Sequence, residues 1–178
     1  MSIKNFYPQF PEIPYKQTSI DMPTVVFFAK SLIAKYPIEV VRMGYVIFRN
    51  ESANGKSGVN NNYIGLQADN AEWTGLDLSN VVGTSVKTDG AGDTRRFICF
   101  NADGYKTSFD FLCHKVQQRG MFRDTTTPQG VPYPALKLIA TPLYELYEEK
   151  WVANPKENTE EAKDNFISLY SSSIKAIQ

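Results

Sequence analysis

Glu51 is the residue whose type and position in this chain best suit acid–base chemistry. It stands three residues after Phe48 and seven after Gly44, in a run whose apolar residues recur at helical spacing. A helix would carry its carboxyl on the apolar face, where partial removal from water favours the protonated form. A carboxyl protonated near neutral pH can donate its proton to a glycosidic oxygen. The alternative is an exposed glutamate at a frayed helix end.

A second carboxylate would decide which cleavage chemistry Glu51 serves. Hydrolytic glycosidases hold one at about 5–9.5 Å from the acid, to activate water or to form a covalent intermediate. Asp69 is our choice, and Glu72, Asp89 and Asp93 are other acidic residues of the same region. A lytic transglycosylase needs no second carboxylate, because one group can act as acid and then as base. Hydrolysis and transglycosylation both stay open.

Nucleophilic and metal-binding side chains are few. The chain has two cysteines, Cys99 and Cys113, and one histidine, His114. A zinc site needs three or four protein ligands, and adjacent helical residues point in different directions, so these residues do not form a zinc pattern. A single histidine also argues against Ser-His-Asp or Cys-His catalysis. We expect two buried free thiols and no metal or organic cofactor.

Charge and hydropathy argue against several classes of partner. Nineteen basic residues balance nineteen acidic ones among 178 residues, so the chain lacks the basic excess typical of nucleic-acid binders. Residues 1–20 contain three prolines and no apolar run, unlike a signal peptide. The longest apolar stretch, residues 25–29, is too short to cross a bilayer. We expect a protein made in the cytoplasm, without a signal peptide or membrane insertion.

Patterning predicts an α+β fold, mainly α, with a small β lobe at about residues 63–103. Asp21 is suited to cap a helix that ends near Lys35, and Pro37 is suited to begin the next. β-Branched and aromatic residues indicate strands at residues 63–66, 81–86 and 95–100, with a turn at 88–93. Later helices are predicted at about 105–120, 136–152 and 159–176.

Two regions follow from this pattern. Residues 1–20, rich in proline and aromatic residues, are predicted to form an extended arm lying on the body or on a partner. Residues 21–178 are predicted to form a single domain with a cleft between the β lobe and the helices.

The segment around Glu51 resembles a known family. Residues 51–57 read Glu-Ser-Ala-Asn-Gly-Lys-Ser, and residues 60–67 read Asn-Asn-Asn-Tyr-Ile-Gly-Leu-Gln. This is similar to the glucosaminidase-type, lysozyme-like family of bacterial autolysins and flagellar peptidoglycan hydrolases, in which the acid opens a Glu-Ser-x-x-Gly-Lys-Ser segment. The Gly-Leu-Gln step also resembles lytic transglycosylases, which share that fold. The resemblance implies a lysozyme-like domain with Glu51 as general acid beside a glycan cleft.

Later segments continue the resemblance in the same order along the chain. Residues 96–100 and 105–112 look like the family's "Phe-Arg-x-Tyr … Ser-x-x-Asp-x-x-x-Phe-Leu" passage, and residues 140–144 look like its "Ala-Thr-Asp-Pro-x-Tyr" segment. That likeness implies that Tyr144 lies beside the acid, and a core aromatic on helix 136–152 is the alternative. The residues expected to bind substrate are Ser52, Asn62, Tyr63, Gln67 and Tyr105.

The leading functional hypothesis is cleavage of peptidoglycan glycan strands by a glucosaminidase, muramidase or lytic transglycosylase. The small size of the chain, without an internal repeat or a signal peptide, is typical of a bacteriophage lysis enzyme, which would act on the bacterial cell wall. The alternative is a non-catalytic cell-wall-binding or virion structural module that keeps the fold. In that case residues 1–20 would dock onto virion proteins.

Overall fold

The computed structural model describes residues 3–88, 91–123, 132–152 and 160–178. The chain divides into two compact units, each built from segments distant in sequence. Unit 1 comprises residues 1–25 and 48–111, and unit 2 comprises residues 26–47 and 112–178. Helices and two small antiparallel sheets confirm an α+β chain that is mainly α. Residues 1–20 belong to unit 1 together with the β lobe.

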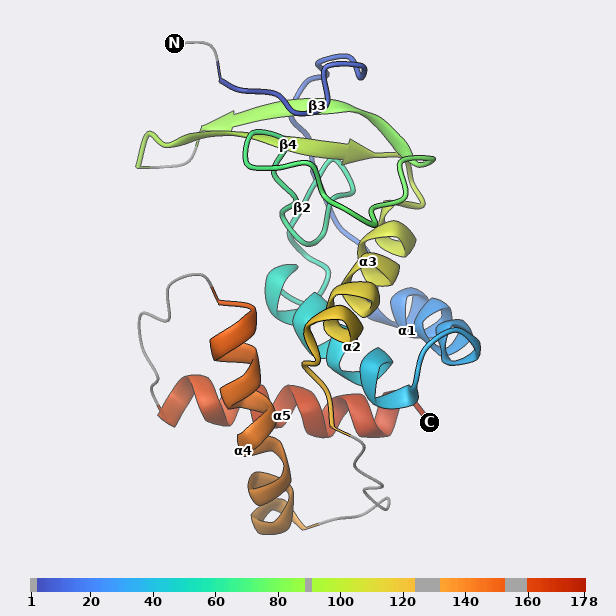
Figure 1. The fold of residues 1–178 in the computed structure, drawn as a ribbon, viewed down its shortest axis with the longest axis vertical. Coiled ribbons are helices and arrows are strands. Elements are labelled where there is room, and N and C mark those ends of the chain that lie inside the picture. Colours follow the sequence, from blue (N-terminus) through green and yellow to red (C-terminus); the bar gives the residue numbers. More distant parts are fainter. Residues whose placement is uncertain (1–2, 89–90, 124–131, 153–159) are drawn as a thin grey trace. The chain divides into compact units, whose positions relative to one another are not determined.

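The helices begin and end close to the predicted positions (Figure 1). They are α1 (Met22–Ser31) with the short 3-10 helix η1 (Leu32–Ala34), α2 (Ile38–Glu51), α3 (Gly104–Arg119), α4 (Tyr133–Lys150) and α5 (Glu160–Ala176). Asp21 caps α1 as expected, because its Oδ1 accepts the Thr24 N–H at 2.9 Å. Gly120 ends α3 with a φ of +65°, which glycine adopts without steric cost. None of the helices in the described ranges is long and apolar enough to cross a membrane.

The β lobe of unit 1 is organised around one hairpin. Strand β3 (Val81–Thr88) pairs antiparallel with β4 (Thr94–Phe100), and the register shifts between Val81 and Gly83. The predicted strands 81–86 and 95–100 are therefore confirmed. The predicted turn at 88–93 lies partly outside the described residues, which lack 89–90.

The predicted strand at residues 63–66 is wrong. The segment meets β4 only at its end and beyond, where the Ile98 N–H donates to the Leu66 carbonyl at 3.0 Å, the Ala68 N–H donates to the Arg96 carbonyl at 2.7 Å and Gln67 bridges Phe97. The N–H groups of Ile64 and Leu66 are directed to a side-chain oxygen rather than to a neighbouring strand. A local side-chain acceptor has thus replaced a strand partner for these two N–H groups.

The arm formed by residues 3–20 lies on its own unit. It borders the free edge of β3, because the Ile13 N–H donates to the Thr84 carbonyl at 2.8 Å and the Thr84 N–H donates to the Pro11 carbonyl at 2.9 Å. Further along, β1 (Gln17–Thr18) pairs antiparallel with β2 (Gly58–Val59). Of the two predicted positions, the structure therefore shows the arm on the body, where it covers a strand edge.

Unit 2 is held together by aromatic packing between α4 and α5. The Phe166 ring centroid lies 5.4 Å from the ring centroids of both Tyr144 and Tyr147. Near the C-terminal ends of α3 and α4, the Arg119 guanidinium donates to the Lys150 carbonyl and the Lys150 ammonium donates to the Arg119 carbonyl. These reciprocal bonds satisfy carbonyl groups that a helix end leaves without partners.

Helix α2 is buried over most of its length and contains a buried ion pair. Every residue from Glu39 to Phe48 is buried. Within this stretch Arg42 Nη1 lies 2.8 Å from Glu39 Oε1, and the two side chains are only 11% and 6% exposed. Arg42 Nε also donates to the Ile177 carbonyl at 3.0 Å, and the Tyr170 hydroxyl donates to Glu39 Oε2 at 3.3 Å. The pair thus links α2 to the C-terminal segment of the chain.

Removing one partner of this pair should destabilise unit 2. Arg42→Met leaves the Glu39 carboxylate buried without its counter-charge, which costs about 3–5 kcal/mol of unfolding free energy. Urea denaturation of wild type and variant measures the loss. A matched control is Lys106→Met, because the Lys106–Asp103 pair has the same i,i+3 spacing and 2.8 Å distance but is exposed. Equal stability of Arg42→Met and Lys106→Met would contradict the assigned role of the buried pair.

Candidate functional site

The turn after α2 presents Glu51. The Ser52 hydroxyl donates to the Phe48 carbonyl at 2.6 Å and accepts the Gly55 N–H at 2.8 Å. Ala53, Asn54 and Gly55 all have positive φ, so the chain reverses directly behind the carboxyl. Glycine is required at position 55, because a Cβ there would overlap the Ile20 carbonyl oxygen. Glu51 is therefore the last residue of α2, at the start of a turn with a defined geometry.

The expected partial burial of the Glu51 carboxyl is wrong, because the residue is exposed. Successive helical residues are rotated by about 100°, and the buried stripe runs from Phe48 to Ser52 rather than to Glu51. Ser52 is accordingly 0% exposed, and its hydroxyl is used within the turn. This corrects the expectation that Ser52 contacts substrate, since it is part of the support behind Glu51.

Two of the asparagines at 60–62 hold separate segments together through their side chains. The Asn60 amide pairs with the arm, accepting the Lys16 N–H at 2.8 Å and donating to the Pro14 carbonyl at 3.0 Å. The Asn61 amide donates to the Phe100 carbonyl at the end of β4 at 3.0 Å. Both residues have positive φ, a conformation that asparagine tolerates better than most residues.

Asn62 is the most fully engaged of the three. Its Nδ2 donates to the carbonyls of Leu66 and Ile98, both at 2.9 Å. Its Oδ1 accepts the N–H groups of Leu66 at 3.1 Å and Ile64 at 3.4 Å. The residue is 1% exposed, so the expectation that it binds substrate is corrected. Its amide satisfies backbone groups of Ile64, Leu66 and Ile98, and the Leu66 carbonyl also accepts the Ile98 N–H at 3.0 Å.

Tyr63 is likewise a core residue. It is 2% exposed, and its ring centroid lies 5.8 Å from that of Phe48, which also packs on Phe109. Burial raises the pKa of the Tyr63 phenol, and a hydrogen bond with Thr18 acts in the opposite direction. A substrate contact by Tyr63 is therefore not supported by its position, since the ring stabilises the unit from inside.

Asp69, the predicted second carboxylate, is bonded to β4. Its Oδ2 accepts the Arg96 N–H at 3.1 Å, and its buried Oδ1 has no hydrogen-bond partner among the described residues. On the Arg96 side chain, Nη1 donates to Glu12 Oε2 at 2.6 Å and to Thr84 Oγ1 at 3.1 Å. A buried oxygen of this kind fits a bound water better than an open contact with substrate. The other acidic choices, Glu72 and Asp93, are exposed, and Asp89 lies outside the described residues.

Gln67 lies beside an open surface. It is half-buried and lines a hollow of about 360 Å³ together with residues of the β3–β4 hairpin, Lys87, Asp93, Arg95 and Phe97. Its position is compatible with the predicted substrate contact. Tyr105, in the first turn of α3, is also half-buried, and its ring lies 5.7 Å from the Lys106 ammonium.

Tyr144 belongs to unit 2, where it is a core aromatic of α4. It is 2% exposed, and its ring meets that of Phe166 edge-on. Burial is the main cause that raises the pKa of its phenol, and the carboxylate of Glu148 adds to the effect. The structure therefore agrees with the alternative prediction for Tyr144, which was a core aromatic residue on its helix.

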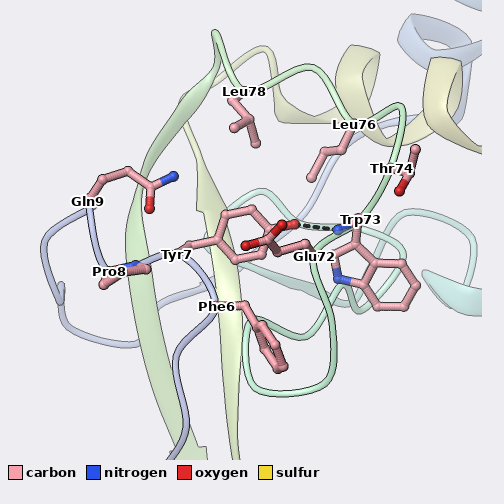
Figure 2. Close-up of a pocket in the computed structure, with 9 residues that line it drawn as sticks. All are labelled: Phe6, Tyr7, Pro8, Gln9, Glu72, Trp73, Thr74, Leu76 and Leu78. Carbon is pink, nitrogen blue, oxygen red and sulfur yellow. Dashed lines mark hydrogen bonds between the residues drawn. The ribbon is translucent and has the colours of Figure 1, made fainter.

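A second hollow in unit 1 is lined by Glu72, one of the other acidic residues considered above, and by residues for which no site was predicted. It has a volume of about 400 Å³ and lies between arm residues 6–9 and residues 72–78 (Figure 2). Glu51 lines neither of these two hollows. The signal available in the sequence was the clustering of aromatic residues in the arm and the neighbouring Glu72-Trp73 pair. No local pattern indicates that these two segments meet.

The thiols and the potential metal ligands have no assigned chemistry. Cys99 and Cys113 are both buried and outside any disulfide, as expected. Burial raises the pKa of the Cys99 thiol to about 12, which disfavours its reactive thiolate. Within the part of the chain that the structure describes, no three His, Cys, Asp or Glu side chains are grouped so that they could hold a metal ion.

Comparison of the chain with protein-family models, with curated proteins and with solved structures finds no match in any of the three.

The supporting role of Asn62 can be tested without any ligand. Asn62→Asp keeps the shape of the side chain but places a carboxylate against the carbonyls of Leu66 and Ile98. Each orphaned buried group costs about 1–3 kcal/mol, so the free energy of unfolding should fall by at least that amount in urea denaturation. Asn70→Asp is the matched control, because Asn70 is exposed. If both variants kept wild-type stability, the amide of Asn62 would not be a structural requirement.

Proposed function

We propose that this chain cleaves the glycan strands of peptidoglycan with Glu51 as general acid, in a lysozyme-like catalytic domain that acts on the bacterial cell wall. The observation that supports this most is the turn after α2, in which Ser52 is buried and hydrogen-bonded while Glu51, at the start of the turn, is exposed. A turn whose backbone is held by a buried hydroxyl is suited to present the adjacent carboxyl in a defined position. The resemblance of residues 51–67 to peptidoglycan hydrolases then supplies the reaction.

In this mechanism Glu51 delivers a proton to the oxygen that leaves the scissile glycosidic bond. The carboxyl is exposed in the structure, so a bound strand must itself exclude water around it, and that exclusion favours the protonated form. After bond cleavage the same group, now a carboxylate, can accept a proton from the attacking nucleophile. That nucleophile is water in a hydrolase and a hydroxyl of the sugar in a lytic transglycosylase.

The alternative function is a cell-wall-binding or virion structural module without turnover. The hollow between the arm and residues 72–78 favours this alternative, because a surface with aromatic side chains and no assigned chemistry can bind without reacting. Docking through residues 1–20 receives less support, since the backbone of the arm is already bonded to its own unit.

Glu51→Gln should abolish cleavage and keep the fold. Glutamine is nearly isosteric with glutamate and occupies an exposed position, but it cannot donate a proton to the leaving oxygen. Positioned acid catalysis contributes about 10²–10⁴-fold, so lysis of purified sacculi, followed as loss of turbidity, should fall by that factor. Thermal melting of the two proteins should coincide. Mass analysis of the released fragments separates the mechanisms, because reducing ends indicate hydrolysis and anhydro ends indicate transglycosylation.

The control for this experiment is Glu161→Gln, since Glu161 is an exposed glutamate of α5. It should lyse sacculi as wild type does. Wild-type activity in Glu51→Gln would remove Glu51 from the mechanism. Absence of lysis by the wild type on every sacculus tested would assign the chain to the non-catalytic alternative.

A further inference from the structure

The hollow between the arm and residues 72–78 is a preformed cavity. Its volume of about 400 Å³ falls within the range of small-molecule sites, which is roughly 300–1,000 Å³. Phe6 and Tyr7 from the arm and Trp73 from the other segment line it, and the Tyr7 ring points toward the backbone of Trp73 (Figure 2). Two chain segments more than sixty residues apart thus supply three aromatic rings to one cavity.

Hydrogen bonds fix the aromatic side chains of this cavity in place. The Tyr7 hydroxyl accepts the backbone N–H of Trp73 at 2.7 Å, which joins the two walls (Figure 2). The indole Nε1 of Trp73 donates to the Gln67 carbonyl at 2.8 Å, and its ring meets Phe111 edge-on at 6.3 Å. Because the polar atom of the indole is already satisfied, the half-buried ring offers a ligand an apolar surface that needs no reordering.

The polar groups of the cavity define the class of ligand. Glu72 is its one charged lining residue, and Gln9 and Thr74 add an amide and a hydroxyl. The Glu72 carboxylate disfavours a ligand carboxylate or phosphate beside it. The Lys4 ammonium lies 4.1 Å from the Phe6 ring centroid but does not itself line the cavity. Carboxylate, amide and hydroxyl oxygens accept hydrogen bonds from hydroxyl and N–H groups, while aromatic rings pack against an apolar C–H face. A pyranose ring combines those two surfaces.

We infer that this cavity binds an uncharged sugar ring, an N-acetylated amino sugar of the glycan strand, with Trp73 as the packing surface and Glu72 as the hydrogen-bond acceptor. The inference rests on the proposed function for the identity of the sugar. None of the residues that line the cavity belongs to the motif at 51–67. Binding here would hold a strand on the lobe whether or not Glu51 cleaves it.

The test measures binding of N,N′-diacetylchitobiose by fluorescence. The chain has two tryptophans, so Trp151→Phe leaves Trp73 as the single reporter. In that background the disaccharide should change the Trp73 emission saturably, with a Kd of about 0.1–10 mM. Adding Glu72→Gln should weaken binding about tenfold, because a charge-assisted hydrogen bond is replaced by a neutral one. Glu145→Gln, at an exposed glutamate of α4, should leave the Kd unchanged.

Several outcomes would overturn the inference. They are the absence of a saturable change up to about 50 mM disaccharide, equal Kd values for Glu72→Gln and Glu145→Gln, and tighter binding of choline chloride than of the disaccharide. The last would assign the cavity to cations, which aromatic rings with a carboxylate also bind.

Failure of this inference and failure of the proposed function are distinguishable. If wild type cleaves sacculi but the disaccharide does not bind near Trp73, only the inference fails. If the disaccharide binds but Glu51→Gln cleaves as wild type does, only the role of Glu51 fails.

Discussion

The backbone that follows Glu51 is buried over much of its length without forming a helix or a long strand, and the rest of unit 1 depends on how its polar groups are satisfied. Buried N–H and carbonyl groups need partners, and regular secondary structure normally provides them. Here the side-chain amides at 60–62 provide many of them, to the arm, to β4 and to the turn that follows. The arm, the hairpin and the motif are thereby held in one unit.

This constraint changes how the sequence motif is interpreted. In the resemblance to peptidoglycan hydrolases, Ser52, Asn62 and Tyr63 were expected to touch substrate, yet all three are buried in the structure. Their side chains instead make contacts within the protein, through the hydrogen bonds of Ser52 and Asn62 and the ring contact of Tyr63 with Phe48. A short motif of this kind describes a local architecture as much as a reaction, and that architecture leaves Glu51 at the surface together with Asn54, Lys56 and Ser57.

Unit 2 is stabilised differently. Its helices satisfy their own backbone groups, so side chains are available for packing and for one buried ion pair. The Glu39–Arg42 pair is retained although an apolar pair of similar volume could be as stable, and its hydrogen bonds to Tyr170 and the Ile177 carbonyl specify where the C-terminal segment lies. Tyr144 packs within this helical core. The aromatic residues of α4 and α5 thus serve stability in unit 2, whereas Trp73 in unit 1 lines an open cavity.

Local signals in the sequence are sufficient to predict the helices and the hairpin, because helical spacing, caps and β-branched runs act over a few residues. Asp21 as a cap, Pro37 before α2 and Gly120 after α3 could all be predicted in this way. The three-dimensional fold was needed to establish that Glu51 is exposed, that the Asn62 side chain takes the place of a strand partner at 63–66, and that Tyr7 meets Trp73. Those outcomes depend on contacts between residues far apart in the chain, and such contacts leave no periodic pattern in the sequence.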